Sequence, residues 1–388
     1  MCPPVSIGLI GVGDRLRTVV KNLLRESRGQ IKVVAVYDPD PGAVSLAREQ
    51  FGAAVTVSGS DRELIATPGL DWVFIGTPNC HHADQAVSAL RAGLHVFCEK
   101  PLATNLPDGL RVRDAVTASG RIFAFGLVLR YTPIYRKIKE LLDAGAVGDL
   151  VSFEFNETLN FNHGGYIFGN WRRQRALAGS HILEKCCHDL DLANWFTGKL
   201  PRRVASFGGR DFFVPANERH IARIGPDDNG RAAYQTWRGP RQVNPFTGGA
   251  DIFDNQVAIL EYDGGARATF HTNCNTGLPE RRFYWCGTEG TLRANLATGR
   301  VELARIAHTR HVEEIDYAGE AAGGHGGGDD ELARGLALTL TRGLPPLAGI
   351  DEALRACAVA FAIDEAADGG RVVDLCPLWN QLGLTASG

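Results

Sequence analysis

Short apolar runs alternate with helical patterns through the first third of the chain. The run VSIGLI at residues 5–10 leads into glycines, and residues 14–27 then carry apolar side chains at helical spacing. Residues 82–93 repeat the helical pattern. Further apolar runs lie at residues 31–38, 71–79, 95–101 and 120–129. Strands that alternate with helices predict a doubly wound parallel sheet, so we expect an α/β Rossmann domain here.

The apolar period changes to two in the second part of the chain. Alternating runs occupy residues 150–159, 202–213, 255–274, 281–296 and 300–307. They predict an α+β domain with an open, mostly antiparallel sheet that has one covered face. Asp263, Gly264 and Gly265 divide the third run, which predicts a hairpin turn. The polar stretch 215–245 contains glycines and prolines and predicts a long loop.

The length of 388 residues agrees with two domains of unequal size. We expect the first domain to span residues 1–126 and the second to span residues 127–388. A helical pattern near residues 351–368 could bring the chain back toward the first domain.

Composition narrows the functional classes. The chain is 44% hydrophobic and 22% charged, which is typical of a soluble globular protein. A net charge of −3 gives no reason to expect a nucleic acid or an acidic membrane as a partner. The sequence lacks an apolar run of about 18 residues and a signal-peptide pattern, so we expect a cytoplasmic protein. The nine cysteines are scattered without a C-x-x-C pair and predict packing residues rather than disulfides.

A glycine turn follows the first apolar run. Gly11 and Gly13 would let the backbone approach a pyrophosphate at the start of a helix, and Asp14, Arg15 and Leu16 begin that helix. Leu16 stands where such turns usually carry Gly or Ala, so we expect looser packing between helix and strand. The alternative is a helix start without a ligand.

Asp38 ends the second apolar run, 25 residues after Gly13. In that position a carboxylate would accept hydrogen bonds from an adenine-ribose diol and would repel a 2′-phosphate. We therefore expect NAD as the cofactor, with NADP less favoured.

Two motifs at later strand ends carry a family resemblance. They are G-T-P-N-x-x-H at residues 76–82 and E-K-P at residues 99–101. Together they resemble the dinucleotide-binding half of the Gfo/Idh/MocA oxidoreductases, a family named for glucose-fructose oxidoreductase and inositol dehydrogenase. The similarity continues through FGLVLRYTPIYRKIKELLDAGAVGDLVSFE, GSHILEKCCHDLDLANWFTG, GGHGGGDDELARGLAL and EALRACAVAFAIDEAADGGRVVDL. It covers nearly the whole chain except residues from about 212 to 243.

The resemblance implies roles for the strand-end residues. Lys100 would sit beside the nicotinamide and the substrate hydroxyl, where an ammonium can stabilise a developing alkoxide. The alternative is a surface lysine that follows a strand. Cofactor contacts are expected from Thr77, Pro78, Asn79, His82 and Glu99 as well. The second domain would bind substrate, and its open sheet would pair subunits in a homodimer or homotetramer.

The segment HILEKCCHDLDL at residues 181–192 concentrates reactive side chains. Glu184 and His188 are four residues apart and would share one face of a helix. By resemblance His188 is the general base near the substrate hydroxyl, and Glu184 would orient it. Lys185 could either reach the substrate pocket or pair with Asp189.

A metal or thiol site in this segment is less favoured. Adjacent helical residues point about 100° apart, so Cys186, Cys187 and His188 cannot converge on one ion. A catalytic thiol has no task if NAD performs the oxidation. We therefore expect no metal, and we interpret both cysteines as packing residues.

Other candidate substrate-binding residues are aromatic, histidine or arginine side chains outside this segment. Aromatic rings and arginines suit a polyhydroxylated ligand through stacking and hydrogen bonds, and Arg172 could also meet a substrate carboxylate. The alternative is that the tryptophan is core and the arginines are solvated. The candidates are Arg130, His163, Trp171, Arg172 and His325.

We interpret the chain as an NAD(H)-dependent oxidoreductase that transfers a hydride between nicotinamide and a secondary hydroxyl or ketone. The substrate would be a sugar, a sugar derivative or a cyclitol. One alternative is an NAD-retaining enzyme that cleaves glycosides through transient oxidation. Another is a non-catalytic, NAD-binding regulatory protein.

Overall fold

A computed structural model describes residues 3–237, 242–319 and 324–384. Two compact units account for these residues. The first comprises the ranges Met1–Pro133 and Ala322–Cys357, and the second comprises Ile134–Ala321 and Ala358–Gly388. The first unit thus extends to Pro133 rather than to residue 126. It also includes a C-terminal segment.

The first unit is a Rossmann fold, as the alternation of strands and helices predicted. Its parallel sheet has the order β3-β2-β1-β4-β5-β6. The strands are β1 (Val5–Ile10), β2 (Ile31–Tyr37), β3 (Thr56–Val57), β4 (Trp72–Ile75), β5 (His95–Cys98) and β6 (Phe123–Phe125). The helices are α1 (Asp14–Ser27), α2 (Pro41–Phe51), α3 (Asp61–Ile65), α4 (His82–Arg91), α5 (Leu106–Ser119) and α12 (Gly328–Arg342), with short 3-10 turns η1 (Asn79–His81) and η2 (Val128–Tyr131).

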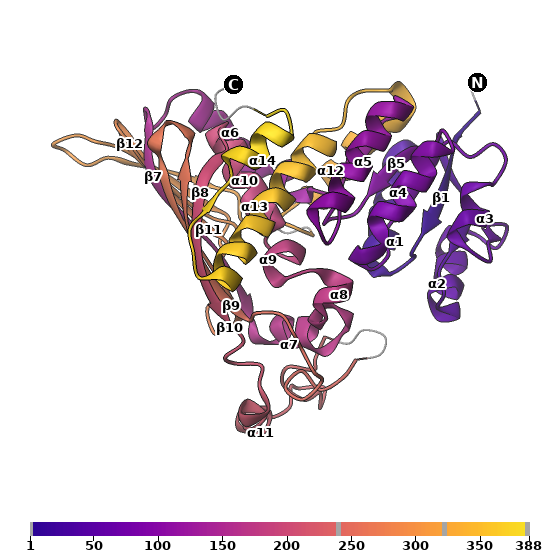
Figure 1. The fold of residues 1–388 in the computed structure, drawn as a ribbon, viewed down its shortest axis with the longest axis horizontal. Helices are drawn as coiled ribbons and strands as arrows, with labels where there is room; N and C mark the ends of the chain where they lie inside the picture. The colour runs from indigo at the N-terminus through magenta and orange to yellow at the C-terminus, as the bar shows by residue number, and fades with distance from the viewer. Residues whose placement is uncertain (1–2, 238–241, 320–323, 385–388) are drawn as a thin grey trace. The chain divides into compact units, whose positions relative to one another are not determined.

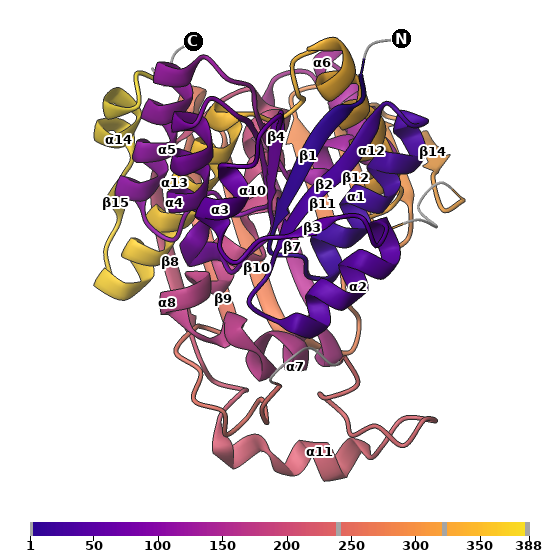
Figure 2. The same ribbon diagram turned by 90° about the vertical axis from the view of Figure 1, so that its right-hand side faces the viewer.

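Helices cover both faces of this sheet. In Figure 2, α3, α4 and α5 lie to the left of the parallel strands, and α1, α2 and α12 lie to the right. The apolar side chains at helical spacing on α1, such as Leu16, Val20 and Leu23, are buried. Burial on both faces explains why these strands read as continuous apolar runs rather than as alternating ones.

The segment from α12 to the start of α13 (Ile350–Gly369) joins the first unit through close backbone contacts. The amide of Phe125 donates to the carbonyl oxygen of Ala348 at 3.0 Å. A β-carbon at Gly328 would lie 2.9 Å from the carbonyl oxygen of Val128, so glycine permits this approach. Leu354 on α13 reaches Gly109 on α5. Periodicity along the chain does not report such long-range contacts.

The second unit contains the mostly antiparallel sheet that the period of two predicted. Its order is β14-β13-β12-β11-β7-β10-β9-β8-β15, and only β7 and β10 pair in parallel among the described strands. The strands are β7 (Leu150–Asn160), β8 (Pro201–Gly209), β9 (Asn255–Tyr262), β10 (Arg267–Thr276), β11 (Arg282–Gly287), β12 (Gly290–Asn295), β13 (Arg300–Arg305), β14 (Val312–Asp316) and β15 (Val373–Asp374). The predicted hairpin turn at Asp263–Gly265 joins β9 to β10.

The two faces of this sheet differ. Helices of the unit are α6 (Pro133–Asp143), α7 (Phe161–Gly169), α8 (Arg175–Ala178), α9 (His181–Glu184), α10 (Cys187–Thr197), α11 (Arg219–Ile224) and α14 (Cys376–Gln381), and Figure 1 labels them. Rings of Tyr135 on α6 and Phe196 on α10 pack against Phe283 on β11, with centroids 6.0 Å and 5.3 Å away. On β8 and β9, Phe207 and Ile259 are 75% and 61% exposed, so the described residues do not cover the other face at this point. None of the helices in the described ranges is long and apolar enough to cross a membrane.

The connection between β8 and β9, called the excursion below, was predicted as a polar loop. It contains a helix, α11, and is anchored by a buried cluster that includes Phe213, Tyr234 and Phe246. This cluster packs on α7, where two adjacent glycines allow close approach. A β-carbon at Gly165 would lie 2.0 Å from the carbonyl oxygen of Tyr234. The excursion is therefore fixed to α7 through its backbone.

The contact at Gly165 predicts a stability effect. Gly165→Ala places a methyl group against the Tyr234 carbonyl and should lower the free energy of unfolding by about 1–3 kcal/mol, the usual cost of overpacking. Gly277→Ala is the matched control, because a β-carbon there meets no atom within 4 Å. Differential scanning calorimetry compares the two variants. Equal unfolding midpoints would contradict the close contact.

Candidate active site

Backbone hydrogen bonds continue past the carboxyl ends of the strands in the first unit. The residues that follow β1, β4, β5 and β6 each donate their amide to the last carbonyl of a neighbouring strand. The pairs are Gly11 to Tyr37, Gly76 to Ile10, Glu99 to Ile75 and Gly126 to Cys98, at 2.8–2.9 Å. This ladder brings the glycine turn, the loop after β4 and the E-K-P motif to one edge of the sheet, where ligands of doubly wound folds bind.

The two glycines of the turn differ in their surroundings, and only Gly11 occupies a conformation that requires glycine. Gly11 has φ of 78°, and a β-carbon there would lie 2.6 Å from the amide nitrogen of Thr77. Gly13 caps α1 without a side-chain hydrogen bond, and a β-carbon there would meet no atom within 4 Å. The start of α1 at Asp14 is therefore open, as a pyrophosphate site needs.

Leu16 does not loosen the packing of α1, contrary to the sequence-based expectation. Its side chain is 1% exposed, and its β-carbon would lie 2.8 Å from a β-carbon placed at Gly76. Close packing of α1 on the sheet needs a small residue at this contact. Here that residue is Gly76, which follows β4, and not a residue of the helix. A glycine after β4 compensates for a leucine on α1.

Asp38 holds the glycine turn from the end of β2. Its carboxylate accepts hydrogen bonds from the amides of Val12 and Asp40, each at 2.9 Å. The side chain is half-buried. These two bonds fix the carboxylate at the edge of the sheet, beside the predicted cofactor turn.

His82 joins two of the predicted cofactor loops. Its side chain is buried, with Nδ1 2.7 Å from the carbonyl oxygen of Pro101 and Nε2 2.9 Å from that of Thr77. Burial lowers the pKa of His82, although both carbonyl groups act in the opposite direction. Asn79 on η1 is buried too, and Pro78 precedes it. Because its ring nitrogens lie against the carbonyl groups of Pro101 and Thr77, His82 holds the loop after β4 close to the loop after β5.

Arg15 and His325 lie in one ion-pair network. Arg15 donates to Glu99 at 3.0 Å and to Asp329 on α12 at 2.6 Å, and His325 Nδ1 lies 3.0 Å from Asp329. Burial tends to raise the pKa of Asp329, but the hydrogen bond from His325 and the charge of Arg15 outweigh it and lower the pKa to about 2. The side chains of Arg15 and Glu99 thus connect α1, β5 and α12.

Lys100 and Arg130 have different surroundings. Lys100 directly follows Glu99 at the ligand edge, is half-buried and precedes a cis peptide bond to Pro101. Arg130 is 7% exposed and donates to the carbonyl oxygen of Leu347 at 3.4 Å. Part of its guanidinium is therefore used inside the first unit, and contact of Arg130 with the substrate stays a prediction.

The segment with Glu184 and His188 is not the single helix that its spacing suggested. α9 ends at Glu184 and α10 begins at Cys187. Between them Cys186 has φ of −93° and ψ of 0°. The argument from one helical face therefore fails for Glu184 and His188, which lie on different helices. Both side chains are buried, at 6% and 4% exposure.

Glu184 binds Arg172, which is itself one of the candidate substrate-binding residues. Arg172 donates from Nε to Glu184 at 3.0 Å and from Nη1 to the hydroxyl of Tyr166 at 3.1 Å. Its guanidinium also lies 4.4 Å from the ring centre of Trp171. The carboxylate that Arg172 meets belongs to the protein itself. Arg172 and Trp171 are half-buried, neither core nor fully solvated.

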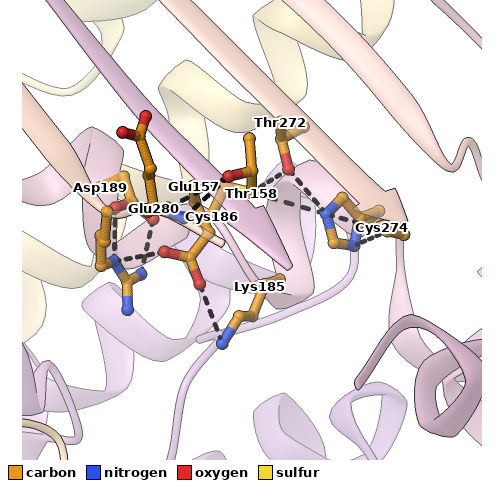
Figure 3. A network of polar contacts seen from close by, with 10 residues as sticks. Glu157, Thr158, Lys185, Cys186, Asp189, Thr272, Cys274 and Glu280 are labelled. Carbon is orange, nitrogen blue, oxygen red and sulfur yellow. Dashed lines mark hydrogen bonds and ion pairs between the residues drawn. The ribbon is translucent and has the colours of Figure 1, made fainter. Parts of the chain in front are cut away.

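Lys185 does not pair with Asp189, contrary to one expectation. Its ammonium lies 3.2 Å from Glu157 on β7, and Figure 3 shows the two side chains pointing toward each other. Arg281 contacts Glu157 at 2.8 Å and binds both carboxylate oxygens of Asp189 at 2.7 Å. Burial raises the pKa of Asp189 to about 6, although Arg281 lowers it. Lys185 ends this chain of charges and is its most exposed member, at 17%.

Cys186 and Cys187 are packing residues, as predicted, with exposures of 0% and 1%. The Cys186 sulfur lies 3.5 Å from the Thr272 hydroxyl, as Figure 3 shows, and 3.8 Å from the imidazole of His181, which also contacts Cys274. Burial raises the pKa of the Cys186 thiol, which disfavours a thiolate. Within the part of the chain that the structure describes, no group of three or more His, Cys, Asp or Glu side chains could hold a metal ion.

His163 lies on α7 beside an aromatic residue that sequence reasoning missed. Its ring centre is 4.6 Å from that of Trp237, which belongs to the excursion. Burial, followed by the charge of Lys185, lowers the pKa of His163 to about 2, so its imidazole is neutral near pH 7. Glu157 and Arg281 were missed as well. Local patterns could not find these three residues, because each meets its partners through long-range contacts.

Two family models match the chain. Residues 5–127 match an oxidoreductase family with an NAD-binding Rossmann fold, and residues 135–293 match the GFO/IDH/MocA C-terminal domain. The chain is 30% identical over 267 residues to levoglucosan dehydrogenase of Pseudarthrobacter phenanthrenivorans, covering 68% of this chain and 64% of that protein. It is 25% identical over 289 residues to 1,5-anhydro-D-fructose reductase of Ensifer adhaerens, covering 74% of each.

The fold also matches solved structures. A levoglucosan dehydrogenase in complex with NADH and levoglucosan superimposes with a TM-score of 0.78 at 20% identity. The match covers 96% of this chain and 99% of that chain. At this identity the likeness establishes the fold.

The buried ion network predicts a large effect on stability. Arg281→Met leaves Glu157 and Asp189 buried with one shared cation removed, so the free energy of unfolding should fall by about 3–5 kcal/mol. Arg293→Met is the matched control, since Arg293 pairs with Glu302 at the surface and should contribute at most about 1 kcal/mol. Denaturant unfolding followed by circular dichroism measures both. Similar losses in the two variants would contradict a buried network.

Proposed function

Because the chain belongs to the Gfo/Idh/MocA oxidoreductase family, we propose that it is an NAD-dependent dehydrogenase acting on a secondary hydroxyl of a sugar, sugar derivative or cyclitol. The reverse reduction of the ketone is the same chemistry. The observation that carries the proposal is the strand-end ladder, which places the glycine turn, the loop after β4 and Lys100 at one edge of the sheet. The names of the two relatives, which refer to levoglucosan and 1,5-anhydro-D-fructose, support this substrate class.

The residues of the glycine turn fit a dinucleotide. When bound, NAD would supply the hydride acceptor. Amides at the open start of α1, from Gly13 through Leu16, would hold the pyrophosphate, and Asp38 would accept hydrogen bonds from the adenine ribose. The charge of Asp38 favours NAD over NADP. Arg15 would contribute its backbone, because Glu99 and Asp329 bind its side chain.

The loop after β4 would form the nicotinamide side of the site. Thr77, Pro78 and Asn79 are its proposed contact residues. Thr77 is held by a hydrogen bond from its hydroxyl to Gln85 at 2.7 Å. His82 and Glu99 would position these contacts through the Thr77, Pro101 and Arg15 bonds described above.

Lys100 and His188 are the proposed catalytic residues. His188 would take the hydroxyl proton as the hydride leaves, because an imidazole is the side chain best suited to proton transfer near neutral pH. Lys100 would donate a hydrogen bond to the same oxygen and stabilise the negative charge that develops there. Glu184, which Arg172 holds in place, would orient the base or a neighbouring substrate hydroxyl.

The remaining candidates divide into contact and supporting residues. Lys185, with its ammonium held by Glu157, is a proposed donor to substrate hydroxyls, and His163, Trp171 and Arg172 are proposed to line the same binding region. Arg130 and His325 would support it through Leu347 and Asp329. The exposed apolar strands around Phe207 and Ile259 are the proposed contact between subunits of a homodimer or homotetramer.

Removal of either proposed catalytic group should abolish most turnover. Lys100→Met and His188→Gln should each lower kcat by about 100-fold to 10,000-fold, while the dissociation constant for NADH stays nearly unchanged. NADH absorbance across a panel of sugars and inositols measures turnover, and calorimetry measures NADH binding. Lys32→Met, an exposed lysine at the start of β2, is the control. Near-normal kcat in both variants would refute the mechanism.

The charge of Asp38 should set cofactor preference. The native enzyme should use NAD with a higher kcat/KM than NADP. Asp38→Asn keeps an oxygen for the Val12 amide but removes the negative charge, so the NADP-to-NAD ratio of kcat/KM should rise about ten-fold or more. Asp40→Asn is a control for a neighbouring carboxylate. A ratio that is unchanged in Asp38→Asn would mean that Asp38 does not face the ribose.

A further inference from the structure

The exposed indole of Trp237 has no role in the proposed chemistry. This side chain is 48% exposed although it lies among ordered aromatic residues. Its ring centre is 4.6 Å from His163, with 34° between the ring planes, and 6.2 Å from Tyr166. Both partners belong to α7. One side of the indole is thus held by the protein, and much of the rest faces solvent.

The backbone around Trp237 is fixed by its neighbours. Tyr234, three residues earlier, is 1% exposed and has φ of 66°, and its amide donates to the Asn162 side chain at 2.8 Å. Its carbonyl packs on Gly165 of α7. The sequence His163-Gly164-Gly165-Tyr166 therefore docks the excursion through its glycines and holds the indole through the flanking rings. Such pre-organisation lowers the entropy cost of binding a ligand.

A continuous set of contacts joins the indole to the candidate catalytic carboxylate. Tyr166 contacts Trp237 on one side and accepts a hydrogen bond from Arg172 on the other, at 3.1 Å. Arg172 in turn donates to Glu184 at 3.0 Å. The indole is thus connected to Glu184 through the Tyr166 ring and the Arg172 guanidinium.

We propose that Trp237, held by His163 and Tyr166, is a subsite for a second ring of the substrate. That ring would be a second sugar, joined by a glycosidic bond to the sugar that is oxidised. The proposal rests on the proposed function and narrows its substrate class to two-ring glycosides. A sugar ring has apolar C–H faces and a polar edge, which suit an exposed indole with the Arg172 guanidinium and the Tyr166 hydroxyl nearby.

A second copy of the chain is a less fitting occupant of this surface. A stable subunit contact buries about 800 Å² on each partner, whereas one aromatic side chain buries only about 150–250 Å². Around Trp237 the excursion is polar, with Arg231 paired to Asp227 and Asn244 bound to Glu218. The large apolar side chains exposed on β8 and β9 form a different surface.

The test compares one-ring and two-ring substrates of the same reacting sugar. Methyl glucoside is set against cellobiose and maltose, and methyl galactoside against lactose, with NAD and the full-length enzyme. The native enzyme should prefer two-ring sugars. Trp237→Ala should lower kcat/KM for them by about three-fold to ten-fold, mainly through KM, and leave one-ring sugars unchanged. Trp237→Phe should restore most of the preference, and Ile306→Ala, 68% exposed, should not alter it.

Calorimetric titration of the same sugars into NADH-saturated protein separates this inference from the proposed reaction. If two-ring sugars bind and Trp237→Ala raises their dissociation constants, the subsite is supported even if no sugar is oxidised. If sugars are oxidised but Trp237→Ala leaves the two-ring preference unchanged, the subsite is refuted and the reaction stands. Absence of binding for every two-ring sugar also refutes it. The proposal is also refuted if Trp237→Ala changes the mass of the oligomer in light scattering but leaves the selectivity unchanged. That result would identify a subunit contact.

Discussion

The ligand edge of the first unit depends on backbone hydrogen bonds that extend a parallel sheet beyond its strands. Because the amides of Gly11, Gly76 and Glu99 are each bound to a neighbouring strand, the loops that follow have little freedom at their starts. Such closeness demands glycine at Gly11, where a β-carbon would collide with Thr77. Lys100 follows directly, so its position is set by the sheet rather than by its own side chain.

In the second unit, ion pairs between side chains fix the positions of the candidate site residues, as backbone hydrogen bonds do in the first unit. Arg172 binds Glu184, Lys185 binds Glu157, and Arg281 binds Asp189 and Glu157. Buried ions are costly unless paired, so each pair also fixes the direction of its side chains. The three cations and three carboxylates balance in charge. In the proposed site, a neutral and well-oriented set of donors and acceptors would suit an uncharged polyhydroxylated substrate better than an anionic one.

Candidate ligand-binding residues of the first unit also form internal bonds. Arg15, Arg130 and His325 are such candidates, and each uses part of its side chain to connect elements of the first unit. Binding residues in a preorganised site need such supports. A residue type that suits a ligand also suits an internal partner. The sequence pattern does not distinguish the two, because the partners lie far away along the chain.

Sequence patterns predicted the Rossmann sheet, the open second sheet with its hairpin, and the strand-end motifs. These follow from local periodicity and from glycine, which a few neighbouring residues reveal. Other features became apparent in the folded chain alone: Gly76 makes room for Leu16, α9 and α10 are separate, and Lys185 pairs with Glu157. The fold also brought Trp237 from a polar stretch to α7. Side-chain pairing across long sequence separations depends on how elements pack, and packing is not encoded in any single stretch of chain.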